Sequence, residues 1–285
     1  MEKCIVMFSG GLDSRLAVKL MQEKGFEPLL VFFQLPFGTG CCNQGCSFNF
    51  SQTQGLKLEI FDCTKGKLFK EYLDIIKKAK HGRGAGMNPC IDCRIFMFKI
   101  TKEFADKTKI KIIATGEVVG QRPMSQQKKQ IEIIEQEAGL QGRIVRPLIE
   151  LGINGRKRDK QIELAKKFKI NYPSPAGGCL LCEKALKNRF KFLFERGIND
   201  EELRLINVGR HFVIDGCWVV LGRDEQENKV IESFKGHIEP DYLGPSAVML
   251  DKGKKGTKEK VKELIKAYSK QGSLEERKKF ERWKL

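Results

Sequence analysis

Residues 3–14, Lys-Cys-Ile-Val-Met-Phe-Ser-Gly-Gly-Leu-Asp-Ser, decide the fold of this 285-residue chain. The first six form a short apolar run, as in a buried strand of a parallel sheet. The last six lead into helical periodicity over residues 14–24. Two glycines between a buried strand and a helix let backbone N–H groups approach a phosphate, and the helix N-terminus adds partial positive charge. The expected phosphate contacts come from Ser9, Gly10, Gly11, Asp13 and Ser14.

Further strands and helices alternate downstream of this loop. Strands are predicted at residues 29–33, 56–61 and 110–115, and helices at residues 67–80 and 94–106. This alternation predicts an α/β fold whose parallel sheet is covered on both faces. In such sheets the ligand lies beyond the carboxyl ends of the strands, where residues 9–14 and 116–126 both fall.

The Ser-Gly-Gly-Leu-Asp-Ser loop after an N-terminal strand resembles the signature of the PP-loop ATP pyrophosphatases. The alternative is a glycine-rich turn capped by Asp and Ser, and a Walker loop is excluded because the Gly-Lys-Ser/Thr ending is absent. The resemblance covers about residues 1–170 and implies an adenine nucleotide α-hydrolase-like fold. It also implies cleavage of ATP to AMP and pyrophosphate, with adenylation of a carbonyl oxygen. Asp13 would orient the loop or hold Mg²⁺, and further nucleotide contacts would come from Phe33, Gly116 and Gln121. Arg122 would lie in the same cleft and contact RNA.

Two Cys-x-x-Cys pairs, Cys90/Cys93 and Cys179/Cys182, are each predicted to open a helix. Clustered cysteines in an intracellular chain indicate a metal, an iron–sulfur cluster or catalysis more than disulfides. Helix N-termini would lower the pKa values of these thiols. A structural Cys₄ zinc site is the commonest use of such pairs. A third group, Cys41-Cys42-x-x-x-Cys46, receives no role.

The segment Asn88-Pro89-Cys90-x-x-Cys93, together with Ala176-Gly177-Gly178-Cys179, is similar to the tRNA thiolation branch of the PP-loop family. Members are 2-thiouridylases and 4-thiouridine synthases, whose cysteines either carry a persulfide or ligate a [4Fe–4S] cluster with one open iron. The resemblance implies Cys93 and Cys179 as catalytic cysteines and Cys90 as a third cluster ligand. Cys182 departs from this pattern and is either a fourth ligand or a spectator. We rank the cluster first, persulfide catalysis second and structural zinc third.

Charge favours a nucleic-acid partner. Lys and Arg number 53 against 36 Asp and Glu, a formal net charge of +17. Such an excess attracts polyanions, although a lysine-rich surface kept for solubility is the alternative. No run of about 18 apolar residues and no secretory signal occur, so we expect a cytoplasmic protein without membrane spans.

A Pro- and Gly-rich break at residues 171–178 divides the chain. We predict a PP-loop domain over residues 1–172, a small α+β RNA-binding domain over residues 173–251 and a solvated or partly disordered basic tail over residues 252–285. Residues 205–250 include a hairpin turning at Asp215-Gly216 and resemble the RNA-binding module of the NFACT proteins. There, Arg210 and Arg223 flank Phe212 and Trp218, which would either stack on a base or form a small core.

The resemblances together imply ATP-dependent thiolation of a tRNA uridine. The sulfur would come from an external donor, either sulfide or a cysteine desulfurase. Two rival functions stay open at this point: a PP-loop ligase or amidotransferase-type enzyme acting on a small molecule with structural zinc, and an RNA-binding protein without catalysis.

Overall fold

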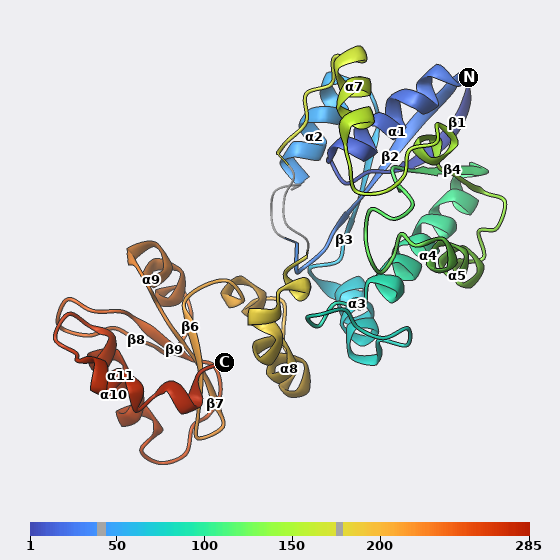
Figure 1. The fold of residues 1–285 in the computed structure, drawn as a ribbon. Coiled ribbons are helices and arrows are strands. Elements are labelled where there is room, and N and C mark those ends of the chain that lie inside the picture. The colour runs from blue at the N-terminus through green and yellow to red at the C-terminus, as the bar shows by residue number, and fades with distance from the viewer. Residues whose placement is uncertain (39–43, 175–178) are drawn as a thin grey trace. The chain divides into compact units, whose positions relative to one another are not determined.

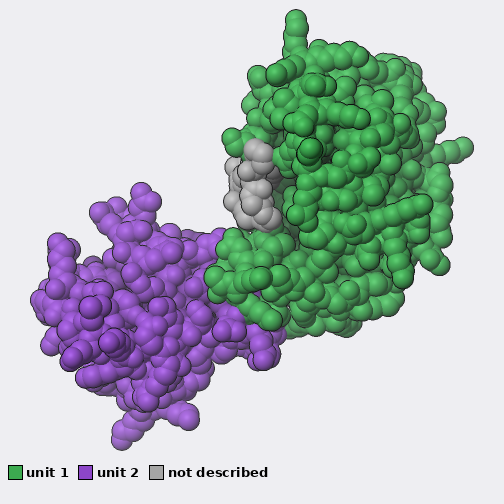
Figure 2. All heavy atoms as spheres, in the orientation of Figure 1, with its two compact units in different colours: residues 1–187 green, residues 188–285 purple. Residues whose placement is uncertain are grey.

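The computed structural model describes residues 1–38, 44–174 and 179–285. The chain divides into two compact units, residues 1–187 and residues 188–285, which Figure 2 shows in different colours. In the described ranges no helix is both long and apolar enough to cross a membrane.

The first unit is built on a five-stranded parallel sheet with the strand order β3-β2-β1-β4-β5. Its strands are β1 (Glu2–Met7), β2 (Phe26–Gln34), β3 (Leu58–Asp62), β4 (Ile112–Thr115) and β5 (Ile144–Val145). Within β1, Cys4, Ile5 and Val6 are fully buried, as expected for a strand covered on both faces. The predicted α/β class with a parallel sheet is confirmed.

Helices cover both faces of this sheet, with α1, α2 and α7 on one side and α3, α4 and α5 on the other (Figure 1). Residues 44–53 form a helix that the sequence pattern does not predict. The helices are α1 (Leu12–Glu23), α2 (Gln44–Thr53), α3 (Gly66–Lys78), α4 (Cys90–Thr108), α5 (Lys128–Ala138), α6 (Pro147–Glu150) and α7 (Asp159–Lys167), with 3₁₀ turns η1 (Leu180–Cys182) and η2 (Lys184–Leu186).

The strand order fixes where a ligand can bind. The chain runs outward from β1 through β2 to β3, and then crosses to β4 on the other side of β1. The connections therefore leave β1 and β4 in opposite directions, which opens a crevice at the carboxyl ends of these two strands. Residues 8–14 follow β1 and residues 116–126 follow β4, so both segments border this crevice.

The second unit contains a four-stranded antiparallel sheet with the order β6-β7-β9-β8. Asp215 and Gly216, with φ of 51° and 84°, turn the predicted hairpin between the first two strands. The strands are β6 (Arg210–Ile214), β7 (Cys217–Leu221), β8 (His237–Ile238) and β9 (Ala247–Met249). The remaining helices and 3₁₀ turns are α8 (Lys187–Arg196), η3 (Glu202–Leu205), α9 (Glu225–Glu232), α10 (Thr257–Tyr268), α11 (Leu274–Lys278) and η4 (Glu281–Trp283).

The segment from Lys252 onward is not a solvated arm, so that expectation is wrong. Helix α10 buries Val261, Leu264 and Ile265 in one core with the sheet residues Phe212 and Val219. These apolar side chains recur at helical spacing and form one face of the helix. The lysines that dominate the composition lie on the opposite, exposed face.

Candidate functional site

The phosphate loop has the predicted strand–loop–helix form. Gly10 has a φ of 80°, a conformation that glycine adopts without strain, and α1 begins two residues later. The Ser14 hydroxyl donates to the Gly11 carbonyl oxygen at 2.9 Å and lies 3.4 Å from the Ser9 hydroxyl. Buried Arg15 donates from Nε to the Gly10 carbonyl oxygen at 2.7 Å. This hydrogen bond stabilises the conformation of the loop.

Gly116, directly after β4, packs closely against the backbone of this loop. A Cβ at Gly116 would lie 2.6 Å from the Asp13 carbonyl oxygen and 2.7 Å from the Ser14 nitrogen, so only glycine fits there. Gln121 donates to Asp13 Oδ2 at 3.0 Å. Asp13 Oδ1 is buried and has no hydrogen-bond partner among the described residues. This acceptor suits a cation such as Mg²⁺ or a donor on a bound ligand.

Phe33 lies on β2 and contacts the neighbouring strand. Its ring stacks on Phe61 of β3, with centroids 5.2 Å apart. The described contacts do not connect it with the phosphate loop.

The two cysteine pairs lie together although residues 94–178 separate them in sequence. The Met87 N–H donates to the Leu181 carbonyl oxygen at 2.7 Å, and the Leu180 N–H donates to the Phe37 carbonyl oxygen at 2.9 Å. A Cβ at Gly86 would clash with that same Leu181 carbonyl oxygen, so the absent side chain permits the close approach. The loop before α4 therefore holds the turn that carries Cys179 and Cys182.

Cys90 is the thiol most readily ionised. Its pKa falls to about 6 because Cys182 donates a hydrogen bond to its sulfur, although burial opposes the shift. The Asn88 side-chain amide also donates to this sulfur at 3.1 Å, and the charges of Arg122 and Arg94 act in the same direction. The same hydrogen bond raises the pKa of the Cys182 thiol, so Cys90 is the more acidic member of this pair.

Cys93 and Cys179 behave in the opposite way, which corrects the expectation that helix N-termini would lower all of these pKa values. Burial raises the pKa of Cys93 to about 11 and that of Cys179 to about 12. Moreover, Cys179 precedes a single 3₁₀ turn and not the predicted helix, so no helix dipole acts on it. The Tyr72 hydroxyl lies 3.5 Å from Cys93 Sγ, and burial raises the pKa of this phenol well above its usual value.

The four thiols are the donor type that iron–sulfur clusters and structural zinc use. Among the described side chains, however, no group of three or more His, Cys, Asp or Glu stands close enough together to hold a metal ion. The arrangement of these thiols corresponds to a hydrogen-bonded pair, Cys90 and Cys182, beside the two protonated thiols Cys93 and Cys179. It does not correspond to a preformed metal site.

Two charged networks that the sequence pattern does not indicate fix the helix that carries Cys90 and Cys93. Fully buried Glu117 pairs with Arg94 and with Arg146, whose Nε lies 3.0 Å from a Glu117 carboxylate oxygen. Burial alone would raise the pKa of Glu117, but the two guanidiniums hold it below its usual range. The ion pair of Arg94 with Glu117 therefore links α4, the helix that carries Cys90 and Cys93, to the segment that follows β4.

The second network holds Asp92, which lies between the two cysteines. Asp92 accepts from the His81 backbone N–H at 3.1 Å and contacts His81 Nδ1 at 2.9 Å. His81 Nε2 in turn lies 2.8 Å from Glu137 of α5. A lone histidine and a carboxylate eleven residues apart carry no recognisable motif, so the sequence alone could not identify this network.

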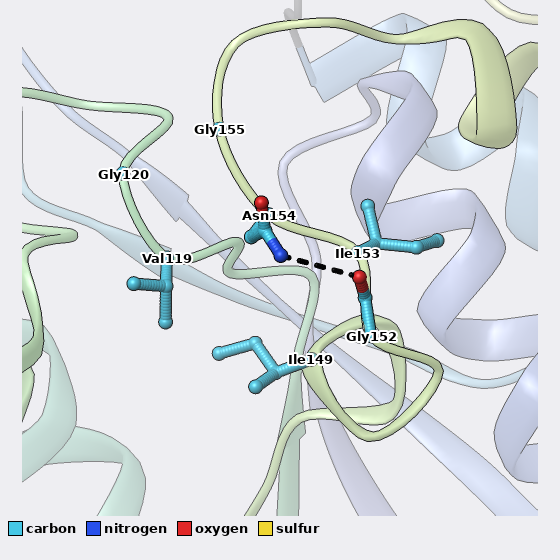
Figure 3. Close-up of a pocket in the computed structure, with 7 residues that line it drawn as sticks. All are labelled: Val119, Gly120, Ile149, Gly152, Ile153, Asn154 and Gly155. Carbon is cyan, nitrogen blue, oxygen red and sulfur yellow. Dashed lines mark hydrogen bonds between the residues drawn. The ribbon is translucent and has the colours of Figure 1, made fainter.

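An open pocket of about 510 Å³ lies beside the predicted cleft. Figure 3 shows Val119 and Ile149 facing the same space, with Asn154 donating to the Gly152 carbonyl oxygen at its edge. Gly120, which also lines it, directly precedes Gln121. None of the predicted site residues lines this pocket, so it adjoins the phosphate loop without containing it.

The residues predicted to contact RNA differ in their exposure and in their partners. Arg122 is exposed, and its charge acts on Cys90 in the first unit. In the second unit, Arg210 stacks over Tyr268 at 5.1 Å and Arg223 pairs with Glu227. Phe212 and Trp218 are fully buried, so they form a core and do not stack on an exposed base.

Cys46 is the described member of the third cysteine group, and an Arg15 guanidinium nitrogen lies 3.1 Å from its sulfur. Cys41 and Cys42 lie outside the described residues, as do Ala176, Gly177 and Gly178 of the second cysteine motif.

Comparison with known proteins relates the chain to a family. The model described as "Thiamine biosynthesis protein (ThiI)" matches residues 1–175, which include the phosphate loop and the first cysteine pair but end before Cys179. A probable tRNA sulfurtransferase of Saccharolobus islandicus (strain M.16.27) is 26% identical over 225 residues, 76% of this chain and 54% of that protein. One of Mycoplasma genitalium is 32% identical over 175 residues, 58% of this chain and 40% of that protein. The chain thus spans about half the length of the curated relatives it matches.

A solved structure, of a 4-thiouridine synthetase–RNA complex with bound ATP, aligns with a TM-score of 0.44. Its sequence is 18% identical, and the alignment covers 88% of this chain and 55% of that chain.

Proposed function

Because the chain belongs to the family of the thiamine biosynthesis protein ThiI, we propose that it is an ATP-dependent tRNA sulfurtransferase that thiolates a uridine. The names of its relatives support tRNA as the substrate, since they are probable tRNA sulfurtransferases. The first resemblance, to the PP-loop thiolation enzymes, agrees with this family. The likeness of residues 205–250 to the NFACT module stays a prediction.

One observation carries this proposal: the loop after β4 contacts both the phosphate loop and Asn88, the residue that donates to the Cys90 sulfur. Gln121 donates to Asp13 at 3.0 Å, while the neighbouring Arg122 lowers the pKa of Cys90. Asn88, which donates to Cys90, also lies 3.5 Å from Met124 Sδ of the same loop. A substrate bound at this loop would therefore meet both an activated phosphate and a nucleophilic sulfur.

In the first step, a uracil carbonyl oxygen attacks the α-phosphorus of ATP and pyrophosphate leaves. The backbone N–H groups of residues 9–14 and the N-terminus of α1 would bind the pyrophosphate charge. Asp13 Oδ1, which lacks a partner among the described residues, is the acceptor that would bind Mg²⁺. Adenylation turns the carbonyl oxygen into part of AMP, a much better leaving group.

In the second step, sulfur attacks the activated carbon and AMP leaves. In the persulfide form, the terminal sulfur on Cys93 would attack the activated carbon. Cys179, after losing its proton, would then break the S–S bond, which releases the thiocarbonyl and forms a Cys93–Cys179 disulfide. An external thiol would reduce that disulfide. In this form the outer sulfur would come as sulfane sulfur from the persulfide of a cysteine desulfurase, whose own thiol leaves, whereas sulfide would be the donor in the cluster form.

The resemblance favours a [4Fe–4S] cluster on Cys90, Cys93 and Cys179, which would supply an open iron for sulfide. The described thiols do not stand at metal-binding distances from one another, so this form requires them to move together. Metal content separates the two forms. Replacing any of the three cysteines should remove iron together with activity if a cluster is bound, and activity alone if a persulfide is used.

The second unit and the exposed Arg122 would supply contacts to tRNA phosphates, and Arg210 and Arg223 are the further candidates. A small-molecule ligase is the rival enzyme class, and tRNA-independent AMP formation would favour it. An RNA-binding protein without catalysis would release no AMP at all.

The test separates the two half-reactions in protein purified without oxygen and supplied with ATP, Mg²⁺, tRNA and sulfide. AMP and thiolated nucleoside are both quantified by mass spectrometry. Asp13→Asn should lose both products, and Cys93→Ser should lose thiolated nucleoside while still forming AMP. Absence of tRNA-dependent AMP from the unaltered protein would overturn the proposal.

A further inference from the structure

Tyr72 is a fully buried phenol that the reaction above does not use. It lies in the second turn of α3, and its hydroxyl is 3.5 Å from the sulfur of Cys93. A phenol carries one O–H donor, and a buried donor without a partner is unfavourable. The described partner of this hydroxyl is the sulfur that is proposed to carry the transferred atom, and either atom of the pair could be the donor.

The ring of Tyr72 is fixed by the same elements that bring the cysteines together. Phe96 of α4 follows Cys93 by one turn, and its ring centroid lies 5.6 Å from that of Tyr72. The Phe37 ring lies 6.3 Å away on another side, and the Phe37 carbonyl oxygen accepts from Leu180 of the second cysteine turn. The two phenylalanines therefore pack on the ring of Tyr72, whereas its hydroxyl makes the contact with Cys93.

Cys63 completes the surroundings of this phenol. It is buried at the end of β3, and Cys63, Cys93 and Cys179 all act electrostatically on the Tyr72 hydroxyl. Cys63 is buried, whereas Cys93 and Cys179 are half-buried, so protein donors contribute to balancing a negative charge on their sulfurs. A single O–H directed at one of the three sulfurs distinguishes Cys93 from the others.

We propose that Tyr72 is a positioning residue of the sulfur centre, which donates its O–H to the Cys93 sulfur and stabilises negative charge on that atom. The inference rests on the proposed function, because it takes Cys93 as the cysteine that carries sulfur. In the persulfide form, negative charge develops on this sulfur when an external thiol attacks Cys179 in the Cys93–Cys179 disulfide and Cys93 leaves as a thiolate. A hydrogen bond to the charged form favours that form. Adenylation takes place at a different group and does not need the phenol.

Two variants of the same cluster test this role. Tyr72→Phe removes the hydroxyl and keeps the ring, whereas Phe96→Leu keeps the hydroxyl and removes a ring partner. The readout is the ratio of thiolated nucleoside to AMP, measured in the full chain with ATP, tRNA, a cysteine desulfurase with cysteine as the sulfur source, and a thiol reductant. Tyr172→Phe, which loses a phenol elsewhere in the first unit, is the matched control.

We expect Tyr72→Phe to lower that ratio about tenfold while AMP formation stays at the unaltered rate, since a hydrogen bond to a charged group has an effect of about that size. Phe96→Leu and Tyr172→Phe should keep the ratio. An unchanged ratio in Tyr72→Phe, or an equal loss in Phe96→Leu, would overturn the inference. If the unaltered protein forms no thiolated nucleoside, the proposed function itself fails, which is a separate outcome.

Discussion

At the scale of single residues, Gly116 determines whether the phosphate loop can keep its shape. The backbone of Asp13 and Ser14 occupies the space where a side chain would project. An added methyl group would meet backbone atoms, which cannot move aside as the end of a flexible side chain can. The loop, whose N–H groups are the phosphate donors, would have to shift.

We therefore predict that Gly116→Ala lowers tRNA-dependent AMP formation at least about tenfold, equivalent to a loss of about 1.4 kcal/mol of transition-state stabilisation. Gly38→Ala is the control, because its Cβ would lie at an ordinary 3.6 Å from the Leu35 carbonyl oxygen. AMP release is followed in both variants under saturating tRNA. Normal release by Gly116→Ala would show that this close packing does not matter for the loop.

At the scale of elements, a buried histidine makes the sheet of the second unit sensitive to acid. His211 Nε2 donates to the Val208 carbonyl oxygen at 2.9 Å, and its Nδ1 accepts from the Trp218 indole at 3.1 Å. Burial, together with the charge of Arg189, lowers the pKa of His211 to about 3, against 6.5 for the free side chain. Between these values only the unfolded chain binds the proton, so stability is complete above about pH 6.5 and is lost as the pH falls toward 3.

The unaltered protein should accordingly lose about 2 kcal/mol more unfolding free energy between pH 6.5 and pH 5 than His211→Gln does. Both tryptophans of the chain, Trp218 and Trp283, lie in the second unit, so indole fluorescence during urea unfolding reports on this unit. Parallel pH dependences in the two proteins would rule out His211 as the source.

Helix α10 is a structural element of the second unit, and its two faces should respond differently to substitution. Leu264 is fully buried against the sheet, so Leu264→Ala should cost about 2–5 kcal/mol of stability. Lys262→Ala, on the exposed face of the same helix, should change stability by less than about 0.5 kcal/mol. The same fluorescence-detected unfolding measures both. Equal effects would mean that α10 does not pack as described.

At the scale of the whole molecule, the net charge of +17 predicts salt-dependent binding to tRNA. Lys258, Lys262 and Lys266 are exposed on α10, and none takes part in the described ion pairs. Changing all three to Gln should lower the slope of log affinity against log salt by about one for each phosphate that is no longer neutralised. Removing equal charge from α3 with Lys70→Gln, Lys77→Gln and Lys78→Gln is the control. An equal decrease of the slope in both triple variants would assign the effect to net charge alone.

The sequence predicted the parallel sheet and the phosphate loop because both follow from local patterns. An apolar run next to Ser-Gly-Gly-Leu-Asp-Ser specifies strand, turn and helix within a few residues. The two cysteine pairs were also visible in the sequence, but their pKa values were not. Whether Cys93 is protonated depends on burial by Tyr72 and other distant residues, and that information is absent from the local pattern.

Two predictions, of a solvated C-terminal arm and of aromatic residues that stack on RNA, were wrong because tertiary packing is absent from the local pattern. The lysine-rich end of the chain has the composition of a solvated arm, yet three apolar side chains on one face of α10 are enough to bury it. Trp218 and Phe212 beside arginines have the composition of an RNA-stacking surface, yet tertiary packing placed them in a core. The overall composition of a segment mostly reflects its exposed residues, whereas its packing is determined by the few apolar residues on one face.

The hydrogen bond between Met87 and Leu181 has a consequence for how the protein is made. The first cysteine pair is synthesised before residues 94–178, so its partner turn does not yet exist at that moment. Contacts between segments so distant in sequence carry a large entropic cost of loop closure and form slowly. We therefore expect the thiol centre to assemble only after Cys182 has emerged, as one of the last features of the first unit to fold.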